Sequence, residues 1–510
     1  MMEPFDVLVV GGGAAGCVIA RQISQAHPDR SVLLLEAGRA NSEARFNKTD
    51  IASLFQIWFT ESDWQLATTH QSGLEDRRIV INQGKVLGGG TSVNALMYVR
   101  GHHQNFLEWQ AAAGGDPNWS PERLQASFRS LEGCLGDWAD PVIRGDGGPL
   151  KISQPRHPSS ASSAFLQACK ELGYEQGDFN GAAQTDVCDF MQLIVDAAGV
   201  RSSTANAFLG EDTPPNLTVR CDTVVERLLM RDGVCEGVLT SEGTTCRGGR
   251  VILTAGALQT PALLMASGIG DPATLESVGV ATTVSNPRVG RNLRDHMRVM
   301  VAYASRVDPG VTELLCEAAL FTRSGLSETP ETDLQINFSA GVDGFIPEQF
   351  LAEEEEPPAH TVIFVPVLTR PYSVGSIDPV LEGGRLTFSI NPNYLGDERD
   401  LATYLRGVDL CRSLARTEAM NGFSISEICP GDAMDDVHYL RSFATTIWHP
   451  VGTCAVGTSV AEGVCDPGFR VWGTENLYVA DASILPTLPS GNPQAAIFAL
   501  ANIASEVILT

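Results

Sequence analysis

The first forty residues alternate between continuous apolar runs and a helical apolar pattern. Phe5–Val10 is a short, unbroken apolar run, which is typical of a buried parallel strand. Glycines and alanines follow, and the next dozen residues carry apolar side chains at helical spacing. A second apolar run, Ser31–Leu35, ends at Glu36. This order predicts a strand–helix–strand unit of about thirty residues.

Further along, short β-branched runs alternate with helical stretches, which predicts an α/β fold with some antiparallel sheet. We expect Asp333–Ala340 and Thr361–Leu368 to be strands of a second sheet. Because proline has no N–H to donate, Pro366 indicates a sheet edge or a bulge. The acidic run Glu353–Glu356 and the two prolines after it indicate an exposed loop, and a mobile lid over a pocket is the functional alternative.

Composition narrows the functional classes. The 510 residues are enough for two or three domains. A net charge of −26 argues against binding nucleic acid or anionic membranes, and solubility is the simpler explanation. The 12 cysteines include no C-x-x-C pair and no zinc-like spacing with histidine, so we expect no metal site and a reduced, cytoplasmic protein. No apolar run has transmembrane length, and no signal peptide is recognisable.

The glycines after the first strand form a nucleotide-binding pattern. Gly11, Gly13 and Gly16 give G-x-G-x-x-G between a strand and a helix. The first glycine permits a tight turn, the second lets a pyrophosphate approach the backbone, and the third allows close helix packing. Glu36, at the end of the second strand, can accept both ribose hydroxyls. The complete pattern predicts a dinucleotide site, and a glycine-rich turn without a ligand is the alternative.

Three later segments favour FAD over NAD. Gly84–Asn94 (G-K-V-L-G-G-G-T-S-V-N) combines glycines and hydroxyls, as a backbone pressed against a ligand would. Val251–Gly256 is a strand that ends in a turn of small residues. Asn476–Ser483 is a strand that closes on Asp481, and a flavin needs an acceptor for its ribityl hydroxyls, whereas a nicotinamide does not.

Five segments resemble the glucose–methanol–choline (GMC) oxidoreductases. They are G-G-G-T-S-V-N-A-L, T-A-G-A-L-Q-T-P-A-L-L-M-A-S-G-I-G, V-G-R-N-L-R-D-H, W-H-P-V-G-T-C and V-A-D-A-S-I-L-P-T-L-P-S-G-N-P, and they follow the family's order along most of the chain. The resemblance implies an α/β fold: a discontinuous, Rossmann-like FAD-binding domain and a substrate domain with a mainly antiparallel sheet backed by helices. We expect residues 1–150, 200–296 and 445–510 in the FAD-binding domain, and residues 151–199 and 297–444 in the substrate-binding domain.

The histidine in W-H-P is the candidate catalytic group. From the sequence alone, His449 is a core histidine, a metal ligand or a catalytic base, and the lack of a second ligand set argues against a metal. The resemblance implies that His449 lies over the flavin and faces Asn492. A neutral imidazole can take the hydroxyl proton of an alcohol. Asn492 can donate an N–H to the developing alkoxide. By the same resemblance, His296 is a structural residue.

The resemblance also implies the positions that contact the cofactor. Some relatives tether FAD to a histidine at the position of Val93, and because valine cannot form that bond, we expect noncovalent FAD. The expected FAD contacts are Gly11, Gly13, Ala14, Ala15, Gly16, Glu36, Ala37, Val86, Gly89, Gly90, Thr91, Asn94, Ala95, Leu96, Val224, Ala255, Gly256, Trp448, Asp481, Ala482, Pro493 and Gln494.

The sequence therefore predicts FAD-dependent oxidation of an alcohol to an aldehyde, by proton abstraction and hydride transfer to flavin N5. Either O₂ or a quinone or protein acceptor reoxidises the flavin, and no feature separates these or indicates an oligomeric state. The alternatives are a hydroxynitrile lyase, a photodecarboxylase (whose cysteine position is Thr369 here) and a flavin-binding protein without turnover. Phe338, Phe364 and Leu368 favour an aromatic or medium-chain primary alcohol if they line the pocket, and otherwise they form the core of the sheet.

Overall fold

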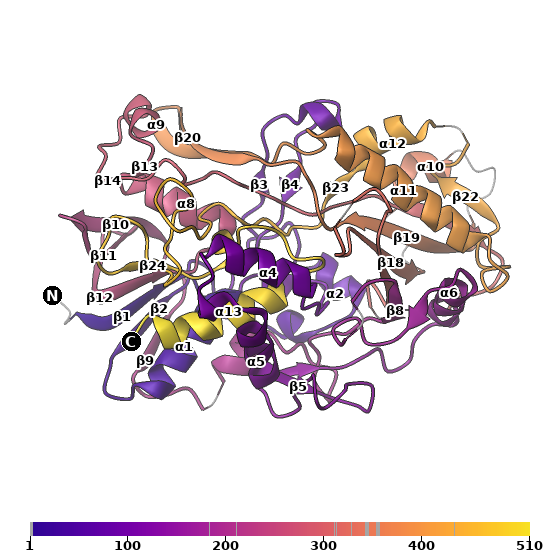
Figure 1. The fold of residues 1–510 in the computed structure, drawn as a ribbon, viewed down its shortest axis with the longest axis horizontal. Helices are drawn as coiled ribbons and strands as arrows, with labels where there is room; N and C mark the ends of the chain where they lie inside the picture. Colours follow the sequence, from indigo (N-terminus) through magenta and orange to yellow (C-terminus); the bar gives the residue numbers. More distant parts are fainter. Residues whose placement is uncertain are drawn as a thin grey trace.

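A computed structural model describes residues 4–509 except residues 183, 211, 311, 313, 328, 342–345, 353–357 and 433. The acidic loop Glu353–Glu356 lies outside the described residues. The described chain forms two large sheets that lie next to each other along the long axis of the molecule, with helices packed around them (Figure 1).

The first sheet has a parallel core of five strands. In spatial order, with neighbours hydrogen-bonded, they are β9 (Leu217–Arg220), β2 (Val32–Leu35), β1 (Phe5–Val10), β12 (Thr245–Leu253) and β24 (Leu477–Val479). Two antiparallel strands, β10 (Val225–Arg231) and β11 (Val234–Thr240), extend the sheet from β12. All four residues of β2 are buried, which explains its unbroken apolar run.

Helices cover this sheet and hold distant segments together. Helix α1 (Ala14–Ala26) packs against the C-terminal helix α13 (Gln494–Val507), and α13 packs against α5 (Pro121–Leu131) (Figure 1). Helix α8 (Gly256–Ala266) follows β12 directly. Because β1, β2, β12 and β24 run parallel, their carboxyl ends meet at one edge of the sheet, where open α/β sheets bind ligands.

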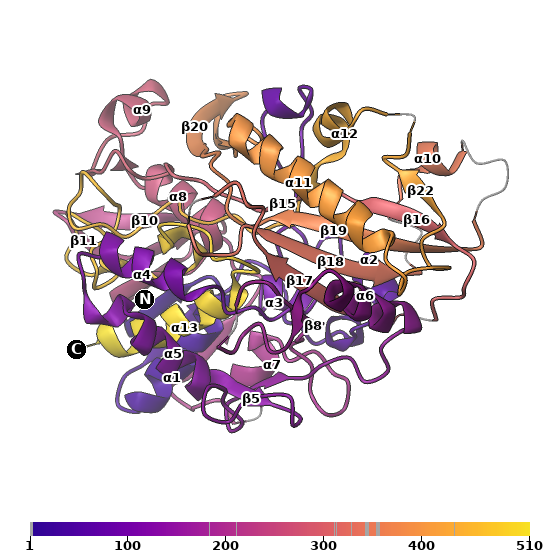
Figure 2. The same cartoon turned by 45° about the vertical axis from the view of Figure 1, so that its right-hand side comes forward.

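The second sheet is mainly antiparallel. Its strand order is β22 (Ser426–Cys429), β16 (Val301–Ser305), β19 (His360–Leu368), β18 (Leu334–Ala340), β17 (Ala318–Thr322), β8 (Val187–Phe190) and β7 (Glu175–Gln176). Two short strands, β15 (Met297–Arg298) and β23 (Thr445–Thr446), pair with each other, and β15 also pairs with β19. Helices α11 (Glu398–Ala415) and α6 (Ser160–Glu171) pack on this sheet (Figure 2).

The position of Pro366 differs from the expectation of a sheet edge. Strand β19 is central, since β18 pairs with one side and β15 and β16 with the other. The carbonyl of Pro366 accepts from the N–H of Val299, which lies between β15 and β16. The missing N–H of the proline therefore falls at a break between two partner strands, where the loss of one ladder hydrogen bond is tolerated.

A candidate active site between the two sheets

A single cavity of about 450 Å³ extends from the carboxyl edge of the first sheet to one face of the second. Of the residues expected to contact FAD or substrate, all except Gly16 and Val86 line it. At Gly16 a Cβ atom would lie 1.9 Å from the carbonyl oxygen of Gly11, so this glycine serves close packing of the turn. Val86 packs into a small apolar cluster with Phe46 and Ile57 and does not line the cavity.

At the end of the cavity next to the first sheet, the buried carboxylate of Glu36 lies near a point where the backbones of Gly13 and Gly89 pack closely together. Glu36 Oε2 accepts from Gly12 N–H and Oε1 from Gly38 N–H, both at 2.7 Å. Burial raises the pKa of Glu36 to about 7, opposed by these two N–H groups. A Cβ atom on Gly89 would lie 2.8 Å from the Cα of Gly13, so a ligand here meets bare backbone. Each oxygen of Glu36 keeps a lone pair for a ribose hydroxyl.

Asp481 lines the cavity, but its carboxylate is already engaged. Oδ2 accepts from Gly256 N–H (2.8 Å) and the Thr260 hydroxyl (2.6 Å). Oδ1 accepts from the N–H (2.8 Å) and hydroxyl (2.6 Å) of Ser483. Burial raises the pKa of Asp481, while these four donors favour the ionised form. These hydrogen bonds join α8 to the C-terminal segment, and the predicted contact of Asp481 with the cofactor stays a prediction.

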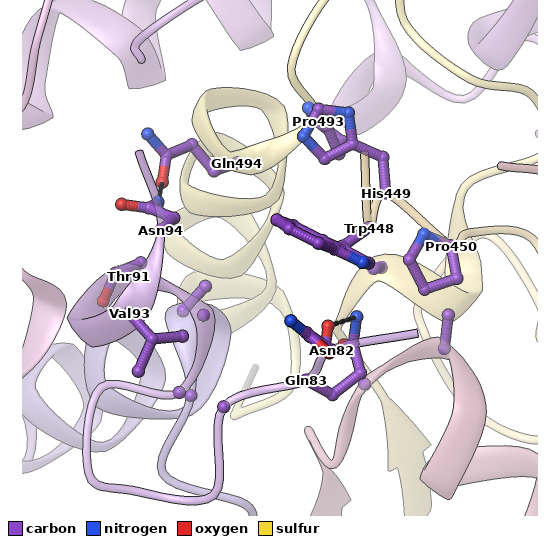
Figure 3. A pocket seen from close by; sticks show the side chains of 18 of the residues that line it. Asn82, Gln83, Thr91, Val93, Asn94, Trp448, His449, Pro450, Pro493 and Gln494 are labelled. Atoms are coloured by element: carbon purple, nitrogen blue, oxygen red, sulfur yellow. Dashed lines mark hydrogen bonds between the residues drawn. The ribbon is translucent and has the colours of Figure 1, made fainter. Parts of the chain in front are cut away.

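A chain of hydrogen-bonded amides lines part of the cavity wall. The Nδ2 of Asn94 donates to Gln494 Oε1, and the Nε2 of Gln494 donates to the carbonyl of Met97, both at 2.6 Å (Figure 3). Arg201, which sequence reasoning did not assign to the site, orients Asn94 by donating to its Oδ1 and its carbonyl, each at 2.8 Å. Burial lowers the pKa of Arg201 to about 9. No local pattern connects these residues, because Arg201 and Asn94 are 107 positions apart.

The ring nitrogens of two histidines define the tautomer of His449. His296 Nε2 lies 2.9 Å from the carbonyl oxygen of Thr369, and because a carbonyl only accepts, this nitrogen carries the proton. Burial lowers the pKa of His296 to about 4, so its ring is neutral and Nδ1 has a free lone pair. His449 Nδ1 lies 3.0 Å from that Nδ1 and must donate to it.

The other nitrogen of His449, Nε2, is consequently an unprotonated acceptor. Asn492 Nδ2 lies 3.2 Å from His449 Nε2 and donates to its lone pair. Burial, and secondarily the neighbouring His296, lower the pKa of His449 well below 6.5. The Oδ1 of Asn492 is buried and has no partner among the described residues. The site thus holds a neutral imidazole nitrogen and an amide N–H side by side.

A buried carboxylate holds the backbone that carries His449. Asp295 Oδ1 accepts from the N–H of His449 at 2.7 Å, and Oδ2 accepts from the hydroxyls of Thr446 and Tyr394, each at 2.5 Å. Burial raises the pKa of Asp295 to about 6, and these donors oppose the shift. Trp448 has a φ of +66°, a left-handed conformation that is rare for a bulky residue and marks a constrained turn.

The second sheet presents alternate residues to the cavity. Asn337 and Ser339 of β18 and Val365 of β19 line it. Phe338 and Phe364, one residue away, point to the opposite face and join the core under α6 and α11. The sequence left open whether these phenylalanines line the pocket, and the structure places them, with Leu368, in the core. In Figure 3 the Trp448 indole lies between the Thr91–Asn94 turn and Pro450.

Comparison with known proteins identifies the family. The chain matches the family models of the GMC oxidoreductases over residues 5–298 and 371–501. It is 33% identical to an alcohol dehydrogenase (acceptor) of Pseudomonas putida, over 99% of this chain and 96% of that protein. It is 32% identical to the oxygen-dependent choline dehydrogenase of Vibrio vulnificus, over 100% of this chain and 95% of that protein. The chain belongs to the GMC oxidoreductase family.

Structural comparison agrees with this assignment. The crystal structure of pyridoxine 4-oxidase from Mesorbium loti superposes with a TM-score of 0.88 at 27% identity, covering 98% of each chain. The predicted GMC-type fold, the oxidoreductase class acting on CH–OH groups and the FAD cofactor are confirmed by family membership. None of the helices in the described ranges is long and apolar enough to cross a membrane. Within the same ranges, no group of three or more His, Cys, Asp or Glu side chains could hold a metal ion.

Proposed function

We propose that this enzyme binds FAD noncovalently along the cavity and oxidises a primary alcohol to an aldehyde, with His449 as the base and Asn492 as the hydrogen-bond donor. The observation that carries the proposal is the hydrogen-bond chain from Thr369 through His296 to His449. This chain leaves the lone pair of His449 Nε2 next to an amide N–H. An alcohol hydroxyl that displaces the contact between Asn492 and His449 can donate to Nε2 and accept from the amide N–H.

The residues that would hold FAD fit that group. Glu36 offers acceptors for a ribose, and the N-terminal end of α1, which follows Gly13, offers backbone N–H groups for a pyrophosphate. The unpartnered Oδ1 of Asn492 offers an acceptor where the flavin is expected. Val93 lines the cavity and has no atom that could form a covalent tether. When bound, FAD supplies the oxidant that accepts the hydride.

The protein's own groups account for the proton. His449 is neutral at physiological pH because burial lowers its pKa, so Nε2 is ready to accept the hydroxyl proton. As Nε2 gains the proton, the Nδ1–H of His449 still donates to His296, and this hydrogen bond strengthens because its donor becomes charged. Asn492 cannot titrate, and its N–H stabilises the negative charge that develops on the alcohol oxygen.

Two further points support the assignments made from the sequence. The strands of the first sheet come from residues 5–35, 217–253 and 477–479, which supports the proposed FAD-binding segments 1–150, 200–296 and 445–510. Strand β23 (Thr445–Thr446), the start of the third segment, still pairs with β15 in the second sheet, so the chain leaves that sheet just after the proposed boundary at residue 445. All 12 cysteines are free thiols, which supports a reducing, cytoplasmic location.

The test is anaerobic flavin reduction by a panel of alcohols. We expect the purified protein to be yellow, acid precipitation to release the FAD, and one class of alcohol to bleach the flavin. His449→Ala should retain FAD but reduce it about 100-fold more slowly. His157→Ala, an exposed histidine, is the control and should behave as the wild type. A near-normal rate in His449→Ala would remove the proposed base. Admission of air then distinguishes O₂ from another acceptor by how fast the colour returns.

A further inference from the structure

Arg298 lies on the wall of the same cavity as the catalytic pair. It is the second residue of β15, opposite Thr445 of β23, and it lines the cavity together with His449. The pairing continues one step beyond the strand, because the N–H of Ile447 donates to the carbonyl of His296 at 3.1 Å. This pair of strands therefore leads from Arg298 to the two histidines along one side of the cavity.

The register of the sheet indicates where the side chain of Arg298 points. Its neighbour Met297 stands opposite Leu368, and both are buried in the core of this sheet and do not line the cavity. Side chains alternate along a strand, so Arg298 faces the other side. Arg298 also stands opposite Val367 of β19, and the cavity-lining Val365 is two residues from that position. All of these positions place the guanidinium group on the cavity side.

The guanidinium has no partner among the described residues. No carboxylate, carbonyl or amide in the described ranges accepts a hydrogen bond from Arg298, and none forms an ion pair with it. Two other enclosed arginines, Arg100 and Arg144, share the carboxylate of Glu132, with closest contacts of 2.5 and 3.1 Å. The enclosed Arg201 has no carboxylate partner, but its guanidinium donates to the carbonyl and amide oxygens of Asn94, whereas Arg298 donates to no described residue.

Burial lowers the pKa of Arg298, and the buried phenols of Tyr404 and Tyr439 oppose this shift, but no carboxylate does. An arginine nevertheless stays charged near neutral pH. An enclosed charge without a counter-ion is unfavourable, and a bound anion that does not belong to the chain would remove this cost.

A second free donor lies on the same wall. Asn337 Oδ1 accepts from Gln335 Nε2 at 2.7 Å, so the amide is oriented and its N–H₂ group has no partner among the residues described. Val367 of β19 pairs with Arg298 on one side and with Gln335 of β18 on the other. Asn337 is two residues from Gln335 along β18, so its side chain is on the same face of the sheet. The same wall also includes the apolar residues Met300, Ile363 and Val365, together with Ser339.

We propose that the alcohol oxidised by this enzyme carries an anionic group, a carboxylate or a phosphate, which Arg298 binds while the hydroxyl lies between His449 and Asn492. The inference rests on the proposed function and names its substrate class. A guanidinium binds either anion through two parallel N–H donors, and the amide of Asn337 supplies a further donor. The apolar wall suits the carbon skeleton that separates the anion from the hydroxyl.

The test compares alcohols that differ only in charge. Flavin reduction is measured anaerobically with para-(hydroxymethyl)benzoate and its methyl ester, and with ω-hydroxyhexanoate and its methyl ester. We expect the apparent second-order rate constant to favour the anion over the ester by about 10- to 100-fold. Arg298→Met should abolish this preference, and Arg298→Lys should retain part of it. The matched control, Arg385→Met, removes an exposed arginine of β21 (Arg385–Asn391) and should keep the wild-type ratio.

Two further measurements separate failure of this inference from failure of the proposed function and distinguish carboxylate from phosphate. Binding of benzoate and of benzamide, followed by the flavin spectrum and by thermal unfolding, tests Arg298 even if no alcohol bleaches the flavin and the proposed function fails. Wild-type protein that binds benzoate no more tightly than benzamide would overturn the inference. So would an Arg298→Met variant that slows anionic and neutral alcohols equally, since Arg298 would then act on the flavin. ω-Hydroxyhexyl phosphate, ranked against ω-hydroxyhexanoate, shows which anion the site prefers.

Discussion

Replacement of His296 tests whether the proton on His449 is positioned as the structure indicates. In His296→Phe, the Nδ1–H of His449 loses its acceptor. The proton of His449 is then no longer held on Nδ1, so Nε2 is not always the unprotonated nitrogen. A hydrogen bond to a charged group contributes about 1.5–3 kcal/mol, and this bond becomes charge-assisted when His449 takes the proton. Since about 1.4 kcal/mol corresponds to a factor of ten in rate, the limiting rate of flavin reduction should fall roughly 10- to 150-fold.

The assay is stopped-flow reduction under anaerobic conditions, with FAD content and thermal midpoint measured on the same samples. A positioning role lowers the limiting rate while the apparent Kd of the alcohol and the FAD content remain near wild type. His296→Gln, whose carbonyl can accept from His449, should recover part of the rate. An unchanged limiting rate in a folded, FAD-loaded His296→Phe protein would refute the reasoning. So would a loss fully explained by weaker alcohol binding.

Two other predictions follow from the buried carboxylate and imidazole. Because burial places the pKa of His449 well below 6.5, the base is already unprotonated at neutral pH, and the reduction rate should stay constant from about pH 8 down to pH 6.5 and fall only below that range. A pH profile with its acid limb at or above pH 6.5 would contradict the assigned environment. Glu36→Ala removes the acceptors for the ribose and should weaken FAD retention on dilution or gel filtration, whereas Glu242→Ala, at an exposed turn, should not. Equal flavin occupancy in the two variants would exclude that role for Glu36.

The strand–helix–strand unit proposed to bind the nucleotide was predictable because its parts are close in sequence. Gly11, Gly13 and Glu36 belong to one strand–helix–strand unit, in which covalent connection and hydrophobic period determine the geometry. The second sheet shows the opposite case. Asn337 and Phe338 are adjacent in the chain, and a shift of one residue exchanges the cavity face for the core face. An apolar run that is buried throughout gives no indication of which face meets the ligand.

By itself, the sequence determined the family and its FAD cofactor, and it supplied the proposed FAD-binding unit and the proposed catalytic pair, because these depend on residue type and on local spacing. The tertiary structure decided the roles that depend on contacts across the chain. His296 meets His449 across 153 positions, and the unpaired state of Arg298 appears only once β15 is placed between β19 and β23. The reason is physical: a tautomer depends on the partner of the opposite ring nitrogen, and the effect of a charge depends on the groups that fail to neutralise it.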